Sequence, residues 1–308
     1  MSVLIRRVFG QVTVQDGGRP GLRHEGIPRG GFADRASARL ANRLVGRDPD
    51  APLLELALAT VEAEFAVATT IAVVGGAPSV TLERVPVQIC RRLRVVPGAV
   101  LRIGGPYQGR YSYLAIGGLG GLPRWRGSSS PLQIGHGWIP EASVVRSGAR
   151  LTILPTVSPQ YNWGVVRARA LHSCSVIEAT PAPETGDYAR WMTGDYATVP
   201  QFGDTDFYVE ADSNRVGTRL RHGYREALPR LLPPVAMPGS SPLLPGTIQA
   251  LRNGDLIVSG PDGPTVGGYP RIGRLTADGS DALAQATGRV RIRLLTSGDA
   301  ARPLKSAR

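Results

Sequence analysis

Arginine, histidine and carboxylate side chains are concentrated near the start of the chain, on a stretch rich in glycine and proline. Residues 15–34 contain Gln15, Asp16, Arg19, His24, Arg29 and Asp34. Polar groups gathered on a loop, with a regular element behind it, are typical of binding and catalytic sites. Because a guanidinium can hold a carboxylate through two parallel hydrogen bonds, Arg19 and Arg29 predict an anion-binding site. The alternative is an ordinary surface turn, since glycine and proline alone would form one.

A second glycine-rich loop with polar side chains lies far downstream. It holds Asp262, Thr265, Gly267, Gly268 and Tyr269. Consecutive small residues, here and at Gly30 in the first loop, let backbone N–H groups approach a carboxylate or a carbonyl closely. An amide or lactam oxygen that gains negative charge would suit such donors, which would then act as an oxyanion hole. The alternative is a pair of β-turns that simply need glycine.

A short helix is expected directly after the first loop. Asp34 can cap its N-terminus, and Gly46 can close its C-terminus. Ala36, Leu40 and Leu44 follow at i, i+4 and i+8, so they predict the apolar stripe that faces the core. The sequence therefore places the polar loop against a regular element.

The rest of the chain favours β-structure, because 39 glycines, 26 prolines and only 6% aromatic residues indicate many turns and short strands. The fold class expected is mainly β (α+β), a barrel or sandwich with a few short helices. A second short helix is expected at 281–286. The expected strands are 3–9, 53–58, 62–67, 70–74, 92–96, 100–103, 111–116, 150–154, 174–178, 207–211, 246–250, 256–259 and 289–295.

Two halves are expected within the 308 residues, because residues 154–165 have the composition of a connector. We expect an N-terminal half over 1–160, a C-terminal half over 161–296 and a disordered tail over 297–308. The longest expected loops are 117–140 and 231–245, and the second is too rich in proline for regular structure.

The basic residues exclude several functions. The net charge is +12, yet Lys305 is the only lysine among 36 basic residues. A P-loop lysine, a Schiff-base lysine and a biotinylated lysine in the body of the chain are therefore excluded. If ATP or biotin is used, another subunit must carry it. The arginines are scattered rather than aligned on one helix, which favours a compositional bias over nucleic-acid binding, although a positive surface could help to dock an acidic partner.

The cysteines and histidines give little sign of a metal site or of secretion. Cys90 and Cys174 indicate a reducing compartment without a disulfide framework. The four histidines have no metal-ligand spacing, so no metal is expected, and His24 is either a hydrogen-bond donor or proton carrier, or a loop-stabilising contact. The chain shows no signal-peptide core and no apolar stretch of membrane-spanning length, so a cytoplasmic protein is expected.

Two blocks of sequence resemble a known family. The first is GRPG-x-x-H-x-G-x-P-x-x-G-x-x-D over residues 18–34, and the second is GTIQ at 246–249 followed by DGPTVGGYPRI at 262–272. Together they resemble the biotin-dependent carboxyltransferase or allophanate hydrolase subunit 2 family, whose bacterial members include the C subunit of 5-oxoprolinase. The resemblance covers roughly residues 3 to 278.

The resemblance implies two cyclophilin-like β-barrel halves and a subunit of an ATP-dependent complex that opens the lactam of 5-oxo-L-proline to give L-glutamate. The implied partners are a subunit-1 homologue, which corresponds to the B subunit of the complex, and a third oxoprolinase subunit. This chain alone would bind no cofactor and be inactive. One alternative is the carboxyltransferase half of a biotin-dependent urea or amide carboxylase. Another is a non-catalytic regulatory subunit, because such a binding role is described for a related member.

The resemblance also suggests site residues. Catalytic roles fall to Arg29, Asp34 and Asp262, and substrate contacts fall to Arg19, His24, Gly30, Thr265, Gly267, Gly268 and Tyr269. Several positions depart from the family pattern: Asn214 stands where a carboxylate is usual, Ser129 where an arginine is usual, and Pro264 and Val266 where glutamine and threonine are usual. If these groups touch substrate, altered specificity or weak activity is expected.

Overall fold

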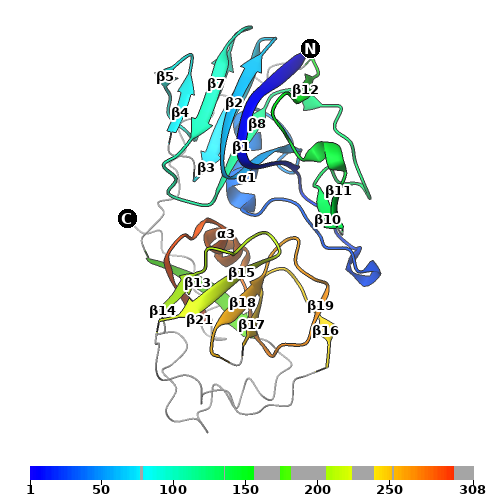
Figure 1. The fold of residues 1–308 in the computed structure, drawn as a ribbon, viewed down its shortest axis with the longest axis vertical. Coiled ribbons are helices and arrows are strands. Elements are labelled where there is room, and N and C mark those ends of the chain that lie inside the picture. The colour runs from blue at the N-terminus through cyan, green and yellow to red at the C-terminus, as the bar shows by residue number, and fades with distance from the viewer. Residues whose placement is uncertain are drawn as a thin grey trace. The chain divides into compact units, whose positions relative to one another are not determined.

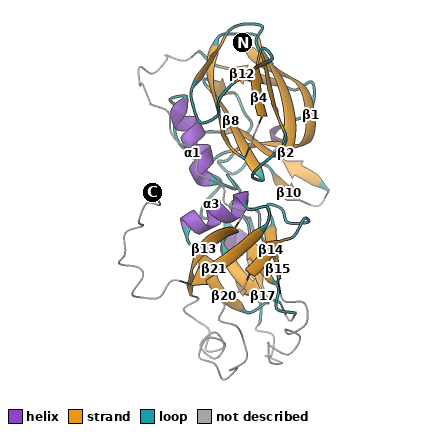
Figure 2. Cartoon of the chain, turned by 90° about the vertical axis from the view of Figure 1, so that its left-hand side faces the viewer, coloured by secondary structure: helices purple, strands orange, loops and turns teal. Residues whose placement is uncertain are grey.

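The computed structural model describes residues 1–76, 79–134, 136–155, 174–181, 206–223, 239–251 and 253–294. The chain forms two compact units, Met1–Leu171 and His172–Arg308, and each is described by itself. Among these residues strands dominate both units and helices are few (Figures 1 and 2), so the expected mainly β class is confirmed. The predicted boundary at 160, the tail at 297–308 and most of the 231–245 loop lie outside the described residues.

The N-terminal unit is built on a ten-stranded sheet. Its order is β5-β4-β7-β2-β1-β12-β9, with β3, β6 and β8 branching from this path, while β10 and β11 form a separate pair. The strands are β1 (Ser2–Gln15), β2 (Leu53–Phe65), β3 (Thr69–Gly75), β4 (Ser79–Leu82), β5 (Val85–Pro86), β6 (Leu93–Val95), β7 (Val100–Gly104), β8 (Tyr111–Ile116), β9 (Leu119–Gly120), β10 (Leu132–Ile134), β11 (Gly137–Ile139) and β12 (Arg150–Ile153).

Strand β2 makes the sheet branch. On one side it pairs with β1 from Gln15↔Leu53 to Val3↔Phe65, with irregular register near Gly10. On the other side its first half pairs with β8 and its second half with β7. Leu58, between these halves, has a φ of 48°, so the strand bends there. The runs 53–58 and 62–67, expected as two strands, are therefore one bent strand that curls around the core.

The core of this unit follows from alternating apolar residues on the long strands. Val12 and Val14 on β1, and Leu54 and Leu56 on β2, are buried on the same inner face. Strand β1 runs on to Gln15, which the sequence analysis had placed in the loop. The segment 117–140, expected as a loop, contains the short strands β9, β10 and β11. A short 3-10 helix, η2 (Glu141–Ser143), follows it.

Helix α1 (Arg35–Leu44) confirms the predicted caps. The Asp34 side chain accepts a hydrogen bond from the Ser37 amide at 3.0 Å. At the other end Gly46 is left-handed, with a φ of 72°, and its amide donates to the Arg43 carbonyl at 3.0 Å. The Arg47 amide reaches the carbonyl of Asn42, inside the helix, at 2.9 Å. The helix thus ends in a Schellman motif.

The predicted apolar stripe of this helix is wrong except for Leu44. Ala36 is exposed and Leu40 is only half-buried, whereas the buried face consists of Ala38, Ala41, Asn42 and Leu44. Small alanines suit this face because α1 packs closely against β3 and β8. The buried positions 38, 41 and 42 follow the i, i+3, i+4 spacing of one helix face, and positions 36 and 40 lie off that face.

The C-terminal unit contains a closed barrel with the strand order β13-β20-β17-β18-β15-β14-β21. Closure leaves no long hydrogen-bonding edge on the barrel. Its elements are β13 (Cys174–Pro181), β14 (Asp206–Val209), β15 (Gly217–His222), β17 (Thr247–Ala250), β18 (Leu256–Ser259), β20 (Arg271–Leu275) and β21 (Arg289–Leu294), with β16 (Ser241–Pro242) pairing β19 (Val266–Gly267) outside it.

Several elements of this unit differ from the sequence analysis, among them the two-residue strands β16 and β19, which were not expected. Strand β15 was not expected, although Thr218 and Leu220 are buried and alternate with exposed Arg219 and Arg221. Strand β20 was not expected either. The helix predicted at 281–286 is α3 (Ala277–Gln285), which starts earlier because the Thr276 hydroxyl caps it by accepting from the Gly279 amide at 2.9 Å.

Within the described parts of the chain, no helix has the length and apolar character needed to cross a membrane.

Candidate functional site

A buried carboxylate organises the N-terminal candidate site. Asp16, directly after β1, is 6% exposed. Its Oδ1 accepts hydrogen bonds from the Gly18 amide at 2.8 Å, the Ser128 hydroxyl at 2.6 Å and the Ser130 hydroxyl at 2.9 Å. Its Oδ2 accepts from the Ser129 amide at 2.7 Å. The carboxylate therefore joins the end of β1 to a serine segment more than a hundred residues away.

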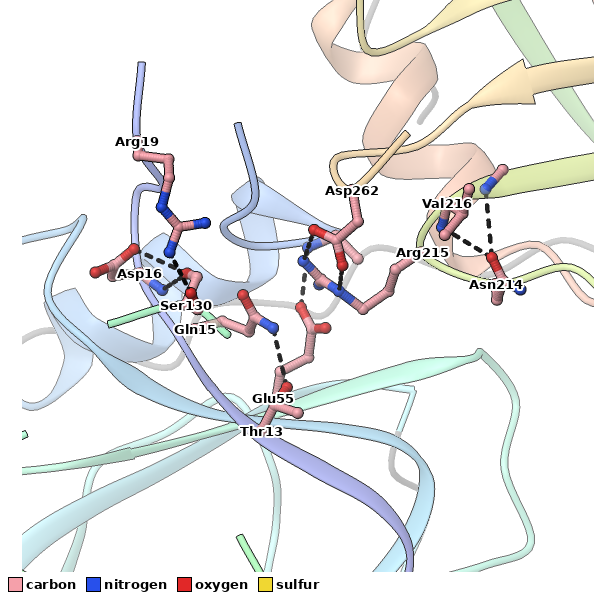
Figure 3. Close-up of polar contacts among 12 residues, drawn as sticks. Thr13, Gln15, Asp16, Arg19, Glu55, Ser130, Asn214, Arg215, Val216 and Asp262 are labelled. Carbon is pink, nitrogen blue, oxygen red and sulfur yellow. Dashed lines mark hydrogen bonds and ion pairs between the residues drawn. The ribbon is translucent and has the colours of Figure 1, made fainter. Parts of the chain in front are cut away.

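Arg19 lies in the same centre and is 2% exposed. Its Nη2 donates to the Ser130 carbonyl, and its guanidinium carbon lies 5.2 Å from the centroid of the Trp125 ring. Figure 3 shows Arg19, Asp16 and Ser130 converging from separate segments. A carbonyl and an aromatic face both orient a guanidinium. The predicted anion-binding residue is therefore held in one place.

The glycines of this block are required by close backbone contact. Residues 16–19 and 29–32 run side by side, joined by the Arg19 amide to the Arg29 carbonyl at 2.7 Å and the Phe32 amide to the Asp16 carbonyl at 3.1 Å. Gly18 has a φ of 79°, and a Cβ there would lie 2.7 Å from the Arg29 carbonyl oxygen. Gly30, a predicted contact residue, is also left-handed and buried. The first loop is thus a closed, specific structure rather than a generic turn.

Two buried polar groups beside this turn have no hydrogen-bond partner among the described residues: Arg29 Nε and Ser129 Oγ. The Arg29 guanidinium makes a weak hydrogen bond through Nη2, which lies 3.5 Å from the carbonyl oxygen of Gly17. Buried polar groups are usually satisfied, so such exceptions are candidates for contact with a ligand. The geometry is consistent with the predicted binding role of Arg29.

Asp34 has a structural task in this structure. Its Oδ1 accepts from the Ser37 amide, its Oδ2 accepts from the Ser37 hydroxyl at 2.6 Å, and its own amide donates to the Tyr113 hydroxyl at 2.7 Å. The adjacent Ala33 amide donates to Glu55 Oε2 at 2.9 Å. Burial, and then the charges of Glu55 and Asp34, raise the pKa of Tyr113 well above its ordinary value. This buried group fixes the start of α1, and catalysis by Asp34 stays a prediction.

His24 lies apart from that centre. It is on the short 3-10 helix η1 (Arg23–Glu25), its side chain is 75% exposed, and its Nε2 is 3.9 Å from Glu25 Oε1. Glu25 in turn pairs with Arg126 at 3.1 Å. Of the two interpretations from sequence, these contacts favour a loop-stabilising role for His24.

The second block is held by an ion pair that the sequence analysis missed. Asp262 accepts two hydrogen bonds from the Arg215 guanidinium, at 2.7 and 2.9 Å, and the two side chains are only 9% and 8% exposed. Figure 3 shows the two groups facing each other. A Cβ at Gly260 would lie 2.0 Å from the Arg215 carbonyl oxygen, so the two loops also touch through their backbones. Asp262 thus ties two loops of the C-terminal unit together.

The remaining predicted residues of this block lie along one short stretch. Gly267 and Gly268 are half-buried, and a Cβ at Gly267 would lie 2.8 Å from Gln249 Oε1. Thr265 is half-buried, and Tyr269 is 42% exposed. A Cβ at Gly267 would lie still closer to Leu243 Cδ1, at 2.5 Å, so the side chains of Leu243 and Gln249 together explain the glycine at 267. Tyr269 is accessible to a ligand.

Residues 25–295 match the family described as carboxyltransferase domain, subdomains A and B. The match covers most of the chain. The chain belongs to this carboxyltransferase family.

Two named relatives support membership of the carboxyltransferase family. The chain is 34% identical over 261 residues to the C subunit of the 5-oxoprolinase of Escherichia coli strain K12, covering 84% of this chain and 80% of the relative. It is 31% identical over 226 residues to urea amidolyase of Lachancea kluyveri, covering 68% of this chain but 12% of that protein. The resemblance stated from the two sequence blocks is confirmed.

Solved structures share the carboxyltransferase fold. The crystal structure of the K. lactis urea amidolyase has a TM-score of 0.78 and 24% identity, covering 96% of this chain and 19% of that chain. The chain thus spans about a fifth of that protein's chain, and it spans 56% of the chain in another matched crystal structure. At this identity the likeness establishes the fold alone.

Sequence reasoning found only part of the candidate site. The structure brings Arg19, Arg29 and Gly30 together at the 16–19 turn, and it places Asp262, Thr265, Gly267, Gly268 and Tyr269 along one loop of the other unit. The residues missed are Glu55, Tyr113 and Trp125. Asp16, the three serines 128–130 and Arg215 lie within stretches that the sequence analysis singled out, but it gave them no role in the site. Asp16 also had a local signal, because an aspartate before two glycines is typical of an Asx-turn. Among the described residues, no three His, Cys, Asp or Glu side chains are placed to hold a metal ion.

Proposed function

We propose that this chain is the C-type component of an ATP-dependent 5-oxoprolinase-like complex, which hydrolyses 5-oxo-L-proline to L-glutamate. The observation that carries the proposal is the 34% identity to the C subunit of 5-oxoprolinase over 84% of this chain and 80% of the relative. The urea amidolyase match, in contrast, covers 12% of that protein. The shared length favours the hydrolase component over a part of the larger carboxylase.

The N-terminal site suits the substrate chemically. 5-Oxo-L-proline carries one carboxylate and one lactam carbonyl. Arg19, oriented by the Ser130 carbonyl and the Trp125 ring, and Arg29, with its buried Nε, would hold the carboxylate. The backbone at Gly30 would approach the lactam oxygen, on which negative charge develops when the ring opens.

The two predicted catalytic carboxylates already have partners. Asp34 caps α1 through Ser37, and Asp262 is paired with Arg215. As hydrogen-bond acceptors with both oxygens engaged, they are held firmly in place. Their catalytic role stays part of the proposal, and proton transfer to either carboxylate would require it to exchange a partner when substrate binds.

ATP is assigned to a partner. The chain carries one lysine, Lys305, so its residues do not fit a P-loop phosphate site, and no step that involves ATP is assigned to it. A B-type homologue (the subunit-1 partner) and a third oxoprolinase component would complete the enzyme, and this chain alone would be inactive. A cytoplasmic location is also part of the proposal, and the free buried thiol of Cys90 is consistent with a reducing compartment.

The test is reconstitution. The chain is purified together with its B-type and third partners, and glutamate release from 5-oxo-L-proline is measured with and without ATP. We expect ATP-dependent release that falls at least about tenfold in Arg29→Ala, because a charge-assisted hydrogen bond to substrate is lost. Arg43→Ala, an exposed arginine of α1, is the matched control. A stable assembly that releases no glutamate would overturn the proposal.

A carboxyltransferase on urea or another amide is the second candidate, favoured by the family itself and by the urea amidolyase relative. It predicts activity that requires a biotinylated partner and is blocked by avidin, whereas the first candidate is insensitive to avidin. A third outcome is a regulatory subunit. In that case Arg29→Ala and Tyr269→Ala would leave function intact, while changes on the partner-binding surface would abolish it.

A further inference from the structure

Asp16 is buried at the centre of the N-terminal site, yet its contacts given by the structure are with serines and backbone amides rather than with an arginine. We propose that Asp16 is the positioning residue of this site, which fixes the serine segment and thereby orients the guanidinium of Arg19. This role is to set the orientation of the Arg19 guanidinium, whether or not a substrate is bound. Its consequence for substrate binding rests on the proposed function.

Two hydrogen bonds join Asp16 to Ser130. The Ser130 hydroxyl donates to Asp16 Oδ1 at 2.9 Å and accepts from the Asp16 amide at 3.0 Å. Ser130 is fully buried, so water cannot replace these bonds. The carbonyl of the same residue accepts from Arg19 Nη2. Asp16 thus sets the place of the carbonyl on which Arg19 rests.

A second route leads from Asp16 to the same guanidinium. The Ser128 hydroxyl donates to Asp16 Oδ1 at 2.6 Å. Ser128 and Trp125 close a tight turn, with the Trp125 amide donating to the Ser128 carbonyl at 2.8 Å and the Ser128 amide donating back at 3.2 Å. The Trp125 ring faces the Arg19 guanidinium at 5.2 Å. By fixing Ser128, Asp16 also fixes the aromatic surface beside Arg19.

The chemistry at position 16 requires two acceptor oxygens. Oδ1 takes three donors and Oδ2 takes the Ser129 amide, so all four contacts need an acceptor. Asparagine has the same shape but offers one oxygen and one NH₂ group. In either orientation the NH₂ group would face an N–H or O–H donor. Asp16→Asn should therefore release the serine segment without creating a cavity.

The decisive measurement does not depend on activity. The chain is labelled with 5-fluorotryptophan, and the ¹⁹F resonance of Trp125 is assigned with Trp125→Phe. Arg19→Ala gives the position of this resonance without the guanidinium. We expect Asp16→Asn to move it toward the Arg19→Ala position, and the double variant to move it no further. Ser128→Ala and Ser130→Ala, which each remove one donor and are milder, should move it in the same direction.

The control is Asp48→Asn. Asp48 also accepts the amide of the residue two positions on, Asp50, at 2.8 Å, but it is exposed and outside the site. This variant should leave the Trp125 resonance unchanged. A folded Asp16→Asn protein with an unmoved Trp125 resonance, or a double variant whose shift is the sum of the two single shifts, would overturn the inference. If Asp16→Asn does not fold, the two serine variants decide the matter by the same criterion.

Kinetics in the reconstituted complex then separate positioning from simple stability. We expect Asp16→Asn to raise KM for 5-oxo-L-proline about 10- to 100-fold, as for a lost hydrogen bond to a charged group, with a smaller effect on kcat. Adding it to Arg19→Ala should lower kcat/KM by less than about threefold more, because both changes act through one guanidinium. Multiplicative losses would contradict the positioning role. A wild-type complex without activity would count against the proposed function, and the ¹⁹F result would still decide the role of Asp16.

Discussion

The two glycine-rich blocks each bury an aspartate, but they satisfy it in opposite ways. In the N-terminal block the Asp16 carboxylate accepts from hydroxyls and backbone amides, and Arg19 rests on a carbonyl and an indole ring. In the C-terminal block Asp262 and Arg215 meet directly in a two-bond ion pair. The same residue types therefore produce two different kinds of structure.

The difference lies in what holds each guanidinium in place. A bidentate ion pair uses the fork of the guanidinium for the protein itself. A carbonyl and an aromatic ring orient a guanidinium without cancelling its charge. The Ser130 carbonyl and the Trp125 ring therefore position the Arg19 guanidinium, whereas the ion pair of Arg215 fastens two loops. Asp262, expected from sequence to be catalytic, has the contacts of a structural tie.

The largest effect is expected at the ion pair. Asp262→Ala leaves the Arg215 guanidinium without that partner, and breaking a buried pair costs about 3–5 kcal/mol of unfolding free energy. Denaturant titration of the variant measures this. Asp212→Ala, which breaks the exposed pair with Arg219, should cost less than about 1 kcal/mol. Equal losses in the two variants would show that Asp262 is not a structural tie.

A somewhat smaller effect is expected from the backbone contact in the first block. Gly18→Ala should lose about 2–4 kcal/mol, because left-handed strain adds to a Cβ 2.7 Å from the Arg29 carbonyl oxygen. Gly21, also left-handed at a φ of 86°, has open space around its Cβ position. Gly21→Ala therefore isolates the strain and should cost about 1 kcal/mol. Similar melting curves for the two variants would contradict the close packing of this turn.

Tyr113→Phe tests the support beneath the first block. Loss of the hydroxyl contacts with Asp34 and Glu55 should cost about 1–3 kcal/mol. The folded state raises the pKa of Tyr113, so the native protein holds this proton more tightly than the unfolded chain does. Stability from this source is complete below about pH 10 and is lost as the pH rises above that value. Urea titrations from pH 9 to 11 should show a shallower decline in Tyr113→Phe, and an unchanged slope would refute this.

The smallest effect is expected at His24. Its side chain is 75% exposed and lies outside the Asp16 centre. His24→Ala should change the free energy of unfolding by less than about 0.5 kcal/mol. In the proposed 5-oxoprolinase-like complex, KM for 5-oxo-L-proline should also be unchanged within about twofold, because this exposed side chain is not part of the Asp16 centre. A tenfold rise in KM would restore His24 to the site and place substrate nearer η1.

The elements that the sequence predicted correctly are those with local causes. Asp34 caps α1 through a residue three positions away, and Gly46 ends the helix through contacts within one turn. Strand β8 matches the predicted run 111–116 because a continuous apolar stretch needs only to be buried on both faces. The two sequence blocks that carry the family resemblance are also local, because each lies within one short segment of the chain.

Contacts between residues far apart in the sequence were decided only by the tertiary structure. Asp16 meets Ser130 across 114 positions and Arg215 meets Asp262 across 47, and no pattern within either segment specifies its partner. The bend at Leu58 and the alanine face of α1 depend on the sheet they pack against. Local sequence fixes caps, turns and strand-forming runs because their energies arise within a few residues. The different roles of the Asp16 and Asp262 carboxylates depend on which distant residues are buried beside them. Those neighbours are brought together only when the chain folds.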